Sequence, residues 1–270
     1  MILETAYAKI NLALHVRRRR ADGYHDLESL FAFAAHGDAL SATPSDCLSL
    51  TIDGQFGEGL SSGDDNLVLR AAQALRSTFE IKQGAALHLD KRLPVASGIG
   101  GGSADAAATL RLLARLWGID PLHPKLFEIA RSLGADVPAC VESVTIWGEG
   151  RGDELRAVEI DGVTGTPLLL INPLVALSTA PVFAGWDQID RGPLDPFIYA
   201  IARNDLSASA IAIVPQIAEI LAKLAKRPGL TLARMSGSGA TCFGLFESVA
   251  ARDTAAVQFR DMWCLATHLR

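Results

Sequence analysis

The sequence predicts an α+β fold made of about two domains. Segments with the periodicity of strands and segments with the periodicity of helices follow one another along the 270 residues, without the regular alternation of a doubly wound sheet. A domain holds roughly 150 residues, so this length suggests two of them. We place residues 1–155 in the first domain and 156–270 in the second. Hydrophobic residues make up 49% of the chain and charged residues 20%, which indicates a folded chain rather than a disordered one.

The first twenty residues are expected to form a strand with two dissimilar faces. Small and apolar side chains recur at every second position and define one face, which consists of Ala6, Ala8, Ile10, Leu12, Leu14 and Val16. The opposite face includes polar groups, and its members are Tyr7, Lys9, Asn11, Ala13 and His15. A strand that carries Lys9 and Asn11 on one face differs from an ordinary core strand.

The remaining elements follow from shorter patterns and from signals at their ends. Short or alternating apolar runs predict strands over residues 27–35, 39–43, 47–53, 85–90, 142–147, 155–160, 167–171, 230–234, 241–246 and 263–268. Helical periodicity predicts helices over residues 64–79, 103–117, 123–133, about 195–226 and 249–260. We expect Asp64 or Asp65 to cap the first of these helices, and Gly134 to end the third.

Charge and cysteine usage argue against several classes of partner. Thirty acidic and 25 basic residues leave a net charge of -5, whereas general nucleic-acid binding needs a basic surface. The four cysteines form no C-x-x-C pair, which argues against disulfide scaffolds and cysteine zinc sites and favours a reducing cytoplasm. The N-terminus lacks a signal-peptide pattern. Residues 162–186 are uncharged but contain Pro167, Pro173 and Pro181, so we expect no membrane span and no membrane partner.

The strongest local signal is a glycine-rich segment between a predicted strand and a predicted helix. Four of the five residues from Gly98 to Gly102 are glycine, which lets the backbone approach a ligand closely. The helix that follows offers free N–H groups to an anion. The segment matches neither a Walker A loop nor the complete dinucleotide-binding fingerprint. Phosphate binding is the favoured interpretation and a flexible connector the alternative. The candidate residues are Pro94, Val95, Ala96, Ser97, Gly98, Ile99, Gly100, Gly101, Gly102, Ser103 and Ala104.

Other polar positions allow two interpretations each. The second glycine cluster, residues 235–241, is either a hairpin loop or the opposite wall of the same phosphate pocket. Lys9 is either a solvated charge or a group that neutralises a phosphate. Asp136 is either a helix cap, with Pro138 in the first turn, or a general base for a substrate hydroxyl. The arginines at 17–20 form a solvated face or steer a diphosphate.

Metal-binding patterns are absent from the sequence. There is no H-E-x-x-H motif, and the six histidines show no metal-ligand spacing. The metalloprotease class is therefore excluded, and we expect no metal site built from protein side chains.

In their order along the chain, five segments resemble the GHMP kinase superfamily: residues 6–12, 21–27, 94–105, 133–138 and 236–243. The first two are similar to the branch that phosphorylates the 2-hydroxyl of 4-diphosphocytidyl-2-C-methyl-D-erythritol in the non-mevalonate isoprenoid pathway. The run Ala-Asp-Gly-Tyr-His at 21–25 is the most selective part of the match. The resemblance implies a two-domain GHMP kinase fold, with an N-terminal domain like domain 2 of ribosomal protein S5 and a ferredoxin-like C-terminal domain.

The resemblance also implies a reaction and assigns residues to it. ATP, accompanied by Mg²⁺, would donate its γ-phosphoryl group to a small-molecule cytidyl diphosphate substrate. Residues 94–104 match the ATP-phosphate loop of the family. Lys9 and Asp136 match its catalytic pair, with Asp136 taking the proton of the hydroxyl. The positions that match the substrate side are Asn11, Tyr24, His25 and Phe183, the last as the aromatic ring that stacks on cytosine.

The sequence departs from the family pattern at two positions and leaves two alternatives. Ala104 stands where the family usually has a second serine, and Ser97 stands where glycine is common. The first alternative is another small-molecule member, such as homoserine or mevalonate kinase; Tyr24 and His25 argue against it. The second is a catalytically silent nucleotide-binding protein, which the retained Lys9 and Asp136 argue against.

Overall fold

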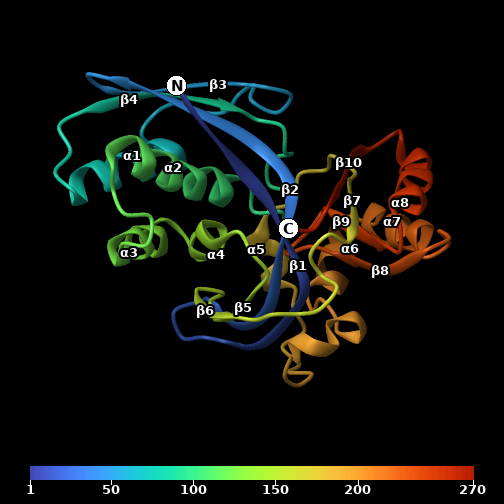
Figure 1. Ribbon diagram of the computed structural model, residues 1–270. Coiled ribbons are helices and arrows are strands. Elements are labelled where there is room, and N and C mark those ends of the chain that lie inside the picture. Colours follow the sequence, from blue (N-terminus) through green and yellow to red (C-terminus); the bar gives the residue numbers. More distant parts are fainter. The chain divides into compact units, whose positions relative to one another are not determined.

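The computed structural model describes residues 1–270, with helices and strands in mixed order along the chain (Figure 1). The predicted α+β class is confirmed. The chain divides into two compact units, each assembled from separate stretches. The first unit holds Met1–Ala8, His36–Val95 and Gly100–Ser143, and the second holds Lys9–Ala35, Ala96–Ile99 and Val144–Arg270. A domain boundary at residue 155 stays a prediction.

Two long strands, β1 (Ile2–Arg19) and β2 (His25–Ser45), pair with each other and contribute residues to both units. In the first unit, the end of β2 pairs antiparallel with β4 (Gly84–Asp90), which pairs parallel with β3 (Leu48–Asp53). In the second unit, the start of β2 pairs antiparallel with β5 (Ile146–Gly150), which pairs with β6 (Glu154–Ala157). The strand predicted for the first twenty residues is thus confirmed as β1.

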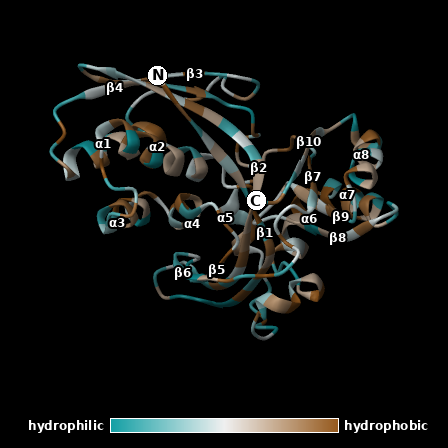
Figure 2. Ribbon diagram, viewed as in Figure 1, coloured by the Kyte–Doolittle hydropathy of each residue, from teal (hydrophilic) through white to brown (hydrophobic).

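Four helices complete the first unit: α1 (Leu67–Thr78), α2 (Gly101–Trp117), α3 (Pro124–Leu133) and α4 (Val137–Glu142). Hydrophilic and hydrophobic residues share α1 and α3 (Figure 2), and the apolar ones are buried. The predicted cap of the first helix was wrong. Asn66, and neither Asp64 nor Asp65, caps α1, because its Oδ1 accepts the N–H of Val68 at 2.9 Å. A helix, α4, ends at residue 142, where the sequence predicted the start of a strand.

A four-stranded antiparallel sheet, in the order β10-β7-β9-β8, forms the rest of the second unit. Its central strands are almost entirely buried. The strands are β7 (Pro167–Asn172), β8 (Leu230–Met235), β9 (Cys242–Phe246) and β10 (Trp263–His268). The helices are α5 (Thr179–Ala184), η1 (Pro196–Ile201), α6 (Ser207–Ile213), α7 (Gln216–Leu224), α8 (Val249–Ala256) and η2 (Val257–Phe259). None of the helices in the molecule is both long and apolar enough to cross a bilayer.

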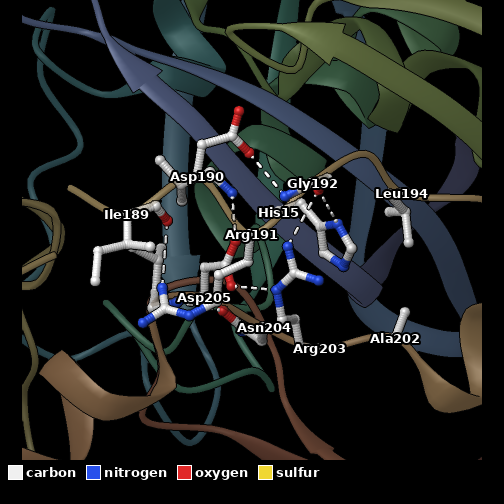
Figure 3. Close-up of polar contacts among 12 residues, drawn as sticks. His15, Ile189, Asp190, Arg191, Gly192, Leu194, Ala202, Arg203, Asn204 and Asp205 are labelled. Atoms are coloured by element: carbon white, nitrogen blue, oxygen red, sulfur yellow. Dashed lines mark hydrogen bonds and ion pairs between the residues drawn. The ribbon is translucent and has the colours of Figure 1, made fainter. Parts of the chain in front are cut away.

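Residues 203–205 run along β1 where the sequence predicted a continuous helix. Figure 3 shows Arg203, Asn204 and Asp205 beside His15 of β1. The N–H of Leu14 donates to the carbonyl of Arg203 at 2.9 Å, and the N–H of Asp205 donates back to the carbonyl of Leu14 at 2.9 Å. The helix predicted over residues 195–226 is therefore replaced by η1, α6 and α7. Pro215 separates α6 from α7, since proline has no N–H to continue a helix.

Three charged side chains are buried together in the first unit, close to the glycine-rich segment. Lys91, which follows β4, places its Nζ 2.6 Å from a carboxylate oxygen of Asp38 and 2.6 Å from one of Asp105. Asp38 also accepts the N–H groups of Arg92 and Leu93. One ammonium faces two carboxylates, and the other oxygen of Asp105 has no hydrogen-bond partner. Burial consequently raises the pKa of Asp105 to about 7, although Lys91 acts to lower it.

Asp105→Asn is expected to make the stability of the fold less dependent on pH. The pKa of Asp105 is raised to about 7 in the folded protein, against about 3.9 in the unfolded chain. The folded protein therefore binds this proton more tightly, which stabilises the fold fully below about pH 3.9. The stabilisation is lost as the pH rises toward 7. The D105N variant has no group to titrate there. Its Tm, measured relative to the unchanged protein, should therefore increase between about pH 5 and pH 8, by on the order of 5 °C.

The control for this prediction is Asp120→Asn, a change of the same kind at an exposed residue beyond the other end of α2. Its Tm difference from the unchanged protein should stay constant with pH. A constant difference for D105N as well would contradict the prediction.

Candidate active site

The glycine-rich segment ends in a helix whose first turn has no side-chain cap. Gly100, in the left-handed conformation with φ of 67°, is the N-cap of α2 and makes no side-chain capping hydrogen bond. Gly101 and Gly102 already belong to the helix, which starts two residues earlier than predicted. Free N–H groups at a helix N-terminus attract an anion. Gly101 also lies against the buried cluster, because a Cβ placed there would be 3.1 Å from Nζ of Lys91.

Within the second unit, the Ala96–Ile99 part of this segment packs directly on the second glycine cluster. The N–H of Thr241 donates to the carbonyl of Ser97 at 3.1 Å. A Cβ at Gly98 would stand 2.5 Å from the carbonyl oxygen of Ser236 and 2.6 Å from that of Gly239. Only a residue without a side chain permits this approach, and the φ of 76° at Gly98 also favours glycine. The structure therefore brings the two glycine-rich segments together.

Lys9 is buried on β1, so its interpretation as a solvated charge was wrong. The side chain is 3% exposed, and its Nζ donates to Oδ1 of Asn11 at 3.2 Å. The ammonium also lies 4.7 Å from the centre of the Phe31 ring, a cation–π contact. The N–H of Lys9 donates to the carbonyl of Ile99 at 3.0 Å, which ties β1 to the glycine-rich segment.

Asn11 is oriented by a residue that sequence reasoning missed. Its Nδ2 donates to the hydroxyl of Ser29 at 2.7 Å, and that hydroxyl donates to the carbonyl of Ala13 at 2.8 Å. Ser29 is fully buried on β2 among apolar neighbours such as Leu30. The signal available in the sequence was a serine within an apolar strand segment, but only the fold shows that Asn11 is its partner.

Asp136 belongs to the first unit, whereas Lys9 and Asn11 belong to the second. It occupies the N-cap position of α4, with φ of -81° and ψ of -17°, and its side chain makes no capping hydrogen bond. Asp136 is therefore the N-cap residue of α4, as the helix-cap interpretation predicted, although its side chain does not supply a capping hydrogen bond. Pro138 does lie in the first turn of α4, as predicted.

The substrate-side candidates of the second unit include a cluster of rings. The rings of His25 and Phe183 lie with their centres 4.9 Å apart and are tilted by 33°. Trp186, which sequence reasoning missed, presents its ring to His25 at 5.7 Å in an edge-on arrangement. Burial, with a contribution from Arg19, lowers the pKa of His25, so that its imidazole is neutral at pH 7 and can both donate and accept hydrogen bonds. Tyr24 is 54% exposed, and the guanidinium of Arg151 lies 5.2 Å from its ring centre.

Comparison with known proteins identifies relatives over the whole chain. Residues 66–143 match the family model for the N-terminal domain of GHMP kinases, and residues 187–263 match the model for their C-terminal domain. The chain is 57% identical to the 4-diphosphocytidyl-2-C-methyl-D-erythritol kinase of Rhizorhabdus wittichii, with 99% of this chain and 94% of the relative covered. It is 51% identical to the protein of the same name from Sphingopyxis alaskensis, with 99% and 98% covered.

Solved structures agree with these relatives. A crystal structure of 4-(cytidine 5'-diphospho)-2C-methyl-D-erythritol kinase superimposes with a TM-score of 0.84 at 32% identity and covers 99% of both chains. Homoserine kinase from Cytophaga hutchinsonii shares the fold, with a TM-score of 0.71 at 16% identity over 98% of this chain and 95% of that one. The predicted resemblance and the GHMP kinase fold are both confirmed. The chain belongs to the GHMP kinase family and, within it, to the group of the 4-diphosphocytidyl-2-C-methyl-D-erythritol kinases.

Proposed function

We propose that this protein transfers the γ-phosphoryl group of ATP to the 2-hydroxyl of 4-diphosphocytidyl-2-C-methyl-D-erythritol. The observation that carries the proposal is 57% identity to a kinase of that name over almost the full length of both chains. Identity to homoserine kinase is only 16% and to an archaeal mevalonate kinase 9%, so the predicted alternatives are not favoured. A phosphorylation assay with Mg-ATP and a panel of alcohols, including homoserine and mevalonate, tests the assignment.

We assign the ATP phosphates to the glycine-rich segment at residues 94–104. The uncapped first turn of α2 supplies N–H donors and the positive end of the helix dipole. The close packing at Gly98 holds the segment in one conformation before ATP arrives. Mg²⁺ would enter with ATP and reduce the negative charge of its phosphates. The protein has no group of three or more His, Cys, Asp or Glu side chains that could hold a metal ion.

Lys9 and Asp136 are assigned the catalytic roles. Phosphoryl transfer depends mainly on positioning and on electrostatic stabilisation. A lysine ammonium that is buried and oriented by Asn11 and Phe31 provides a positive charge that needs little reorganisation during the reaction. Asp136, which matches the family's catalytic aspartate, is assigned the removal of the hydroxyl proton.

The cytidyl group is assigned to His25, Tyr24 and Phe183, and the 2-hydroxyl side of the substrate to Asn11. A neutral imidazole can bond to the edge of a cytosine base, and an aromatic ring can stack on its face. The contact between His25 and Phe183 supports this assignment, because it places both kinds of group side by side. We also propose a cytoplasmic location and no nucleic-acid partner, in keeping with four free cysteines and the net charge of -5.

Asp136→Asn should reduce kcat by about two to four orders of magnitude, because the amide cannot accept the hydroxyl proton. Lys9→Ala should reduce kcat more than it weakens ATP binding, since the charge matters most as the transition state forms. Steady-state kinetics and calorimetric ATP titration measure both. The control is Glu142→Gln, at the exposed end of the same helix α4, which should retain normal turnover. Normal turnover by D136N would refute its role as base.

Gly98→Ala should weaken ATP binding and lower the Tm, because the added Cβ meets two backbone oxygens and a positive φ. Gly162→Ala is the matched control: Gly162 has the same φ of 76°, but nothing lies within 4 Å of its Cβ position. Both variants carry the strain of the backbone, and only G98A carries the clash. Calorimetry and thermal melts should show a clearly larger effect for G98A, and equal effects would contradict the packing argument.

Phe183→Ala and Tyr24→Ala should each raise the KM for the cytidyl substrate about tenfold, since stacking of a base on an aromatic side chain contributes about 1–3 kcal/mol. The KM for ATP should change little. CMP and CDP should compete with the alcohol and not with ATP. Phe197→Ala, which removes an exposed ring on η1, serves as the control with unchanged constants. An unchanged KM in F183A would show that Phe183 does not stack on the base.

A further inference from the structure

We infer that Ser236 is a positioning residue for phosphoryl transfer, whose hydroxyl fixes the strand that carries Lys9 and Asn11 against the glycine-rich segment. The inference rests on the proposed function, because it assigns the ATP phosphates to that segment. Ser236 follows β8 and is completely buried. Its hydroxyl oxygen accepts the N–H of Asn11 at 3.2 Å and donates to the carbonyl of Gly98 at 2.8 Å.

This hydroxyl provides a link between β1 and the glycine-rich segment in addition to a backbone hydrogen bond. The first link is the backbone hydrogen bond from the N–H of Lys9 to the carbonyl of Ile99. A single hydrogen bond between the strand and the segment fixes their separation at one point and does not set the angle between them. The Ser236 link lies two residues further along β1 and one residue earlier in the segment. Two separate points of attachment determine the direction of the strand as well as its position. The side chains of Lys9 and Asn11, which leave β1 at these two points, are oriented with it.

Ser236 can act in this way because its own backbone is held on both sides. Nδ2 of Asn204 donates to the carbonyl of Met235 at 2.8 Å and to that of Gly237 at 2.8 Å. The N–H of Ser236 donates to the carbonyl of Thr241 at 2.9 Å, and the carbonyl of Ser236 accepts the N–H of Gly239 at 2.9 Å. The hydroxyl is therefore presented from a backbone with little freedom to move.

Asn204 is itself anchored to the strand that Ser236 contacts. The residues beside it in Figure 3, Arg203 and Asp205, are hydrogen-bonded to Leu14 of β1. Oδ1 of Asn204 accepts the N–H of Leu206 at 3.0 Å, which orients its amide group. The contacts thus run from β1 to the segment of Asn204, from Asn204 to the residues on either side of Ser236, and from Ser236 back to β1. A shift of Ser236 relative to Asn11 would have to break bonds at several places at once.

Ser236→Ala removes the link without adding bulk. It leaves the N–H of Asn11 and the carbonyl of Gly98 without this partner, while the Lys9–Ile99 hydrogen bond remains. Misplacement of reacting groups by about 1 Å can slow an enzyme about 100-fold. We therefore expect S236A to reduce kcat about 10- to 100-fold. The Kd values for ATP and for the cytidyl substrate, measured by calorimetry, should change by less than about threefold, because the groups that bind each ligand are all retained.

Two further variants separate positioning from general stability. Ser236→Thr keeps the hydroxyl and should restore most of the turnover. Ser209→Ala is the matched control: Ser209 is a buried serine of the same unit, and its hydroxyl donates to the carbonyl of Val182 at 2.7 Å. It should lower the Tm about as much as S236A does and leave kcat unchanged.

The outcomes distinguish this inference from the proposed function. A kcat for S236A within about threefold of the unchanged protein overturns the inference, as does an S236T variant as slow as S236A, or an equal loss of kcat in S209A. Each variant is compared with unchanged protein that phosphorylates the cytidyl alcohol in the same assay. No transfer by the unchanged protein would overturn the proposed function, and the positioning role with it.

Discussion

The contact of one backbone segment with another, at Gly98, is the constraint around which the proposed site is built. There the carbonyl oxygens of Ser236 and Gly239 occupy the space that any side chain would need. This closeness lets residues far apart in the sequence, such as Ser97 and Thr241, join by backbone hydrogen bonds. The requirement for glycine is therefore steric as well as conformational. A ligand is not needed to explain it, although the resulting arrangement leaves the start of α2 uncapped for one.

Two buried lysines of this protein differ in the groups that surround them. Lys9 is enclosed by a neutral amide and an aromatic ring within its unit, which keeps its ammonium in one place. Lys91 is buried to a similar degree but lies between two carboxylates, which largely neutralise it. The same residue type thus contacts an amide and a ring in one unit and two carboxylates in the other.

Local patterns in the sequence predicted a large part of the fold and of the site. The alternation along β1 and the glycines at 98–102 are short-range signals, and the structure confirms the strand and the start of a helix after the glycines. The long helix predicted from residue 195 was wrong, because hydrogen bonds to Leu14, almost 190 residues away in the sequence, determine that stretch. Ser29 and Trp186 were missed for the same reason, and Ser236, although it lies in the second glycine cluster, received no role of its own. They matter because of contacts with residues that are distant in the sequence, and local spacing patterns do not reveal such contacts.

The run of residues 203–205 along β1 also has a consequence for the behaviour of the chain in a crowded solution. β1 pairs with β2 on one side, so its other side would present unpaired N–H and C=O groups. An open strand edge of that kind is a template for pairing with another molecule. Backbone hydrogen bonds at Leu14, and the carboxylate of Asp205 on the N–H of Val16, occupy this edge instead. The segment that leads from η1 to α6 therefore protects the protein against edge-to-edge aggregation.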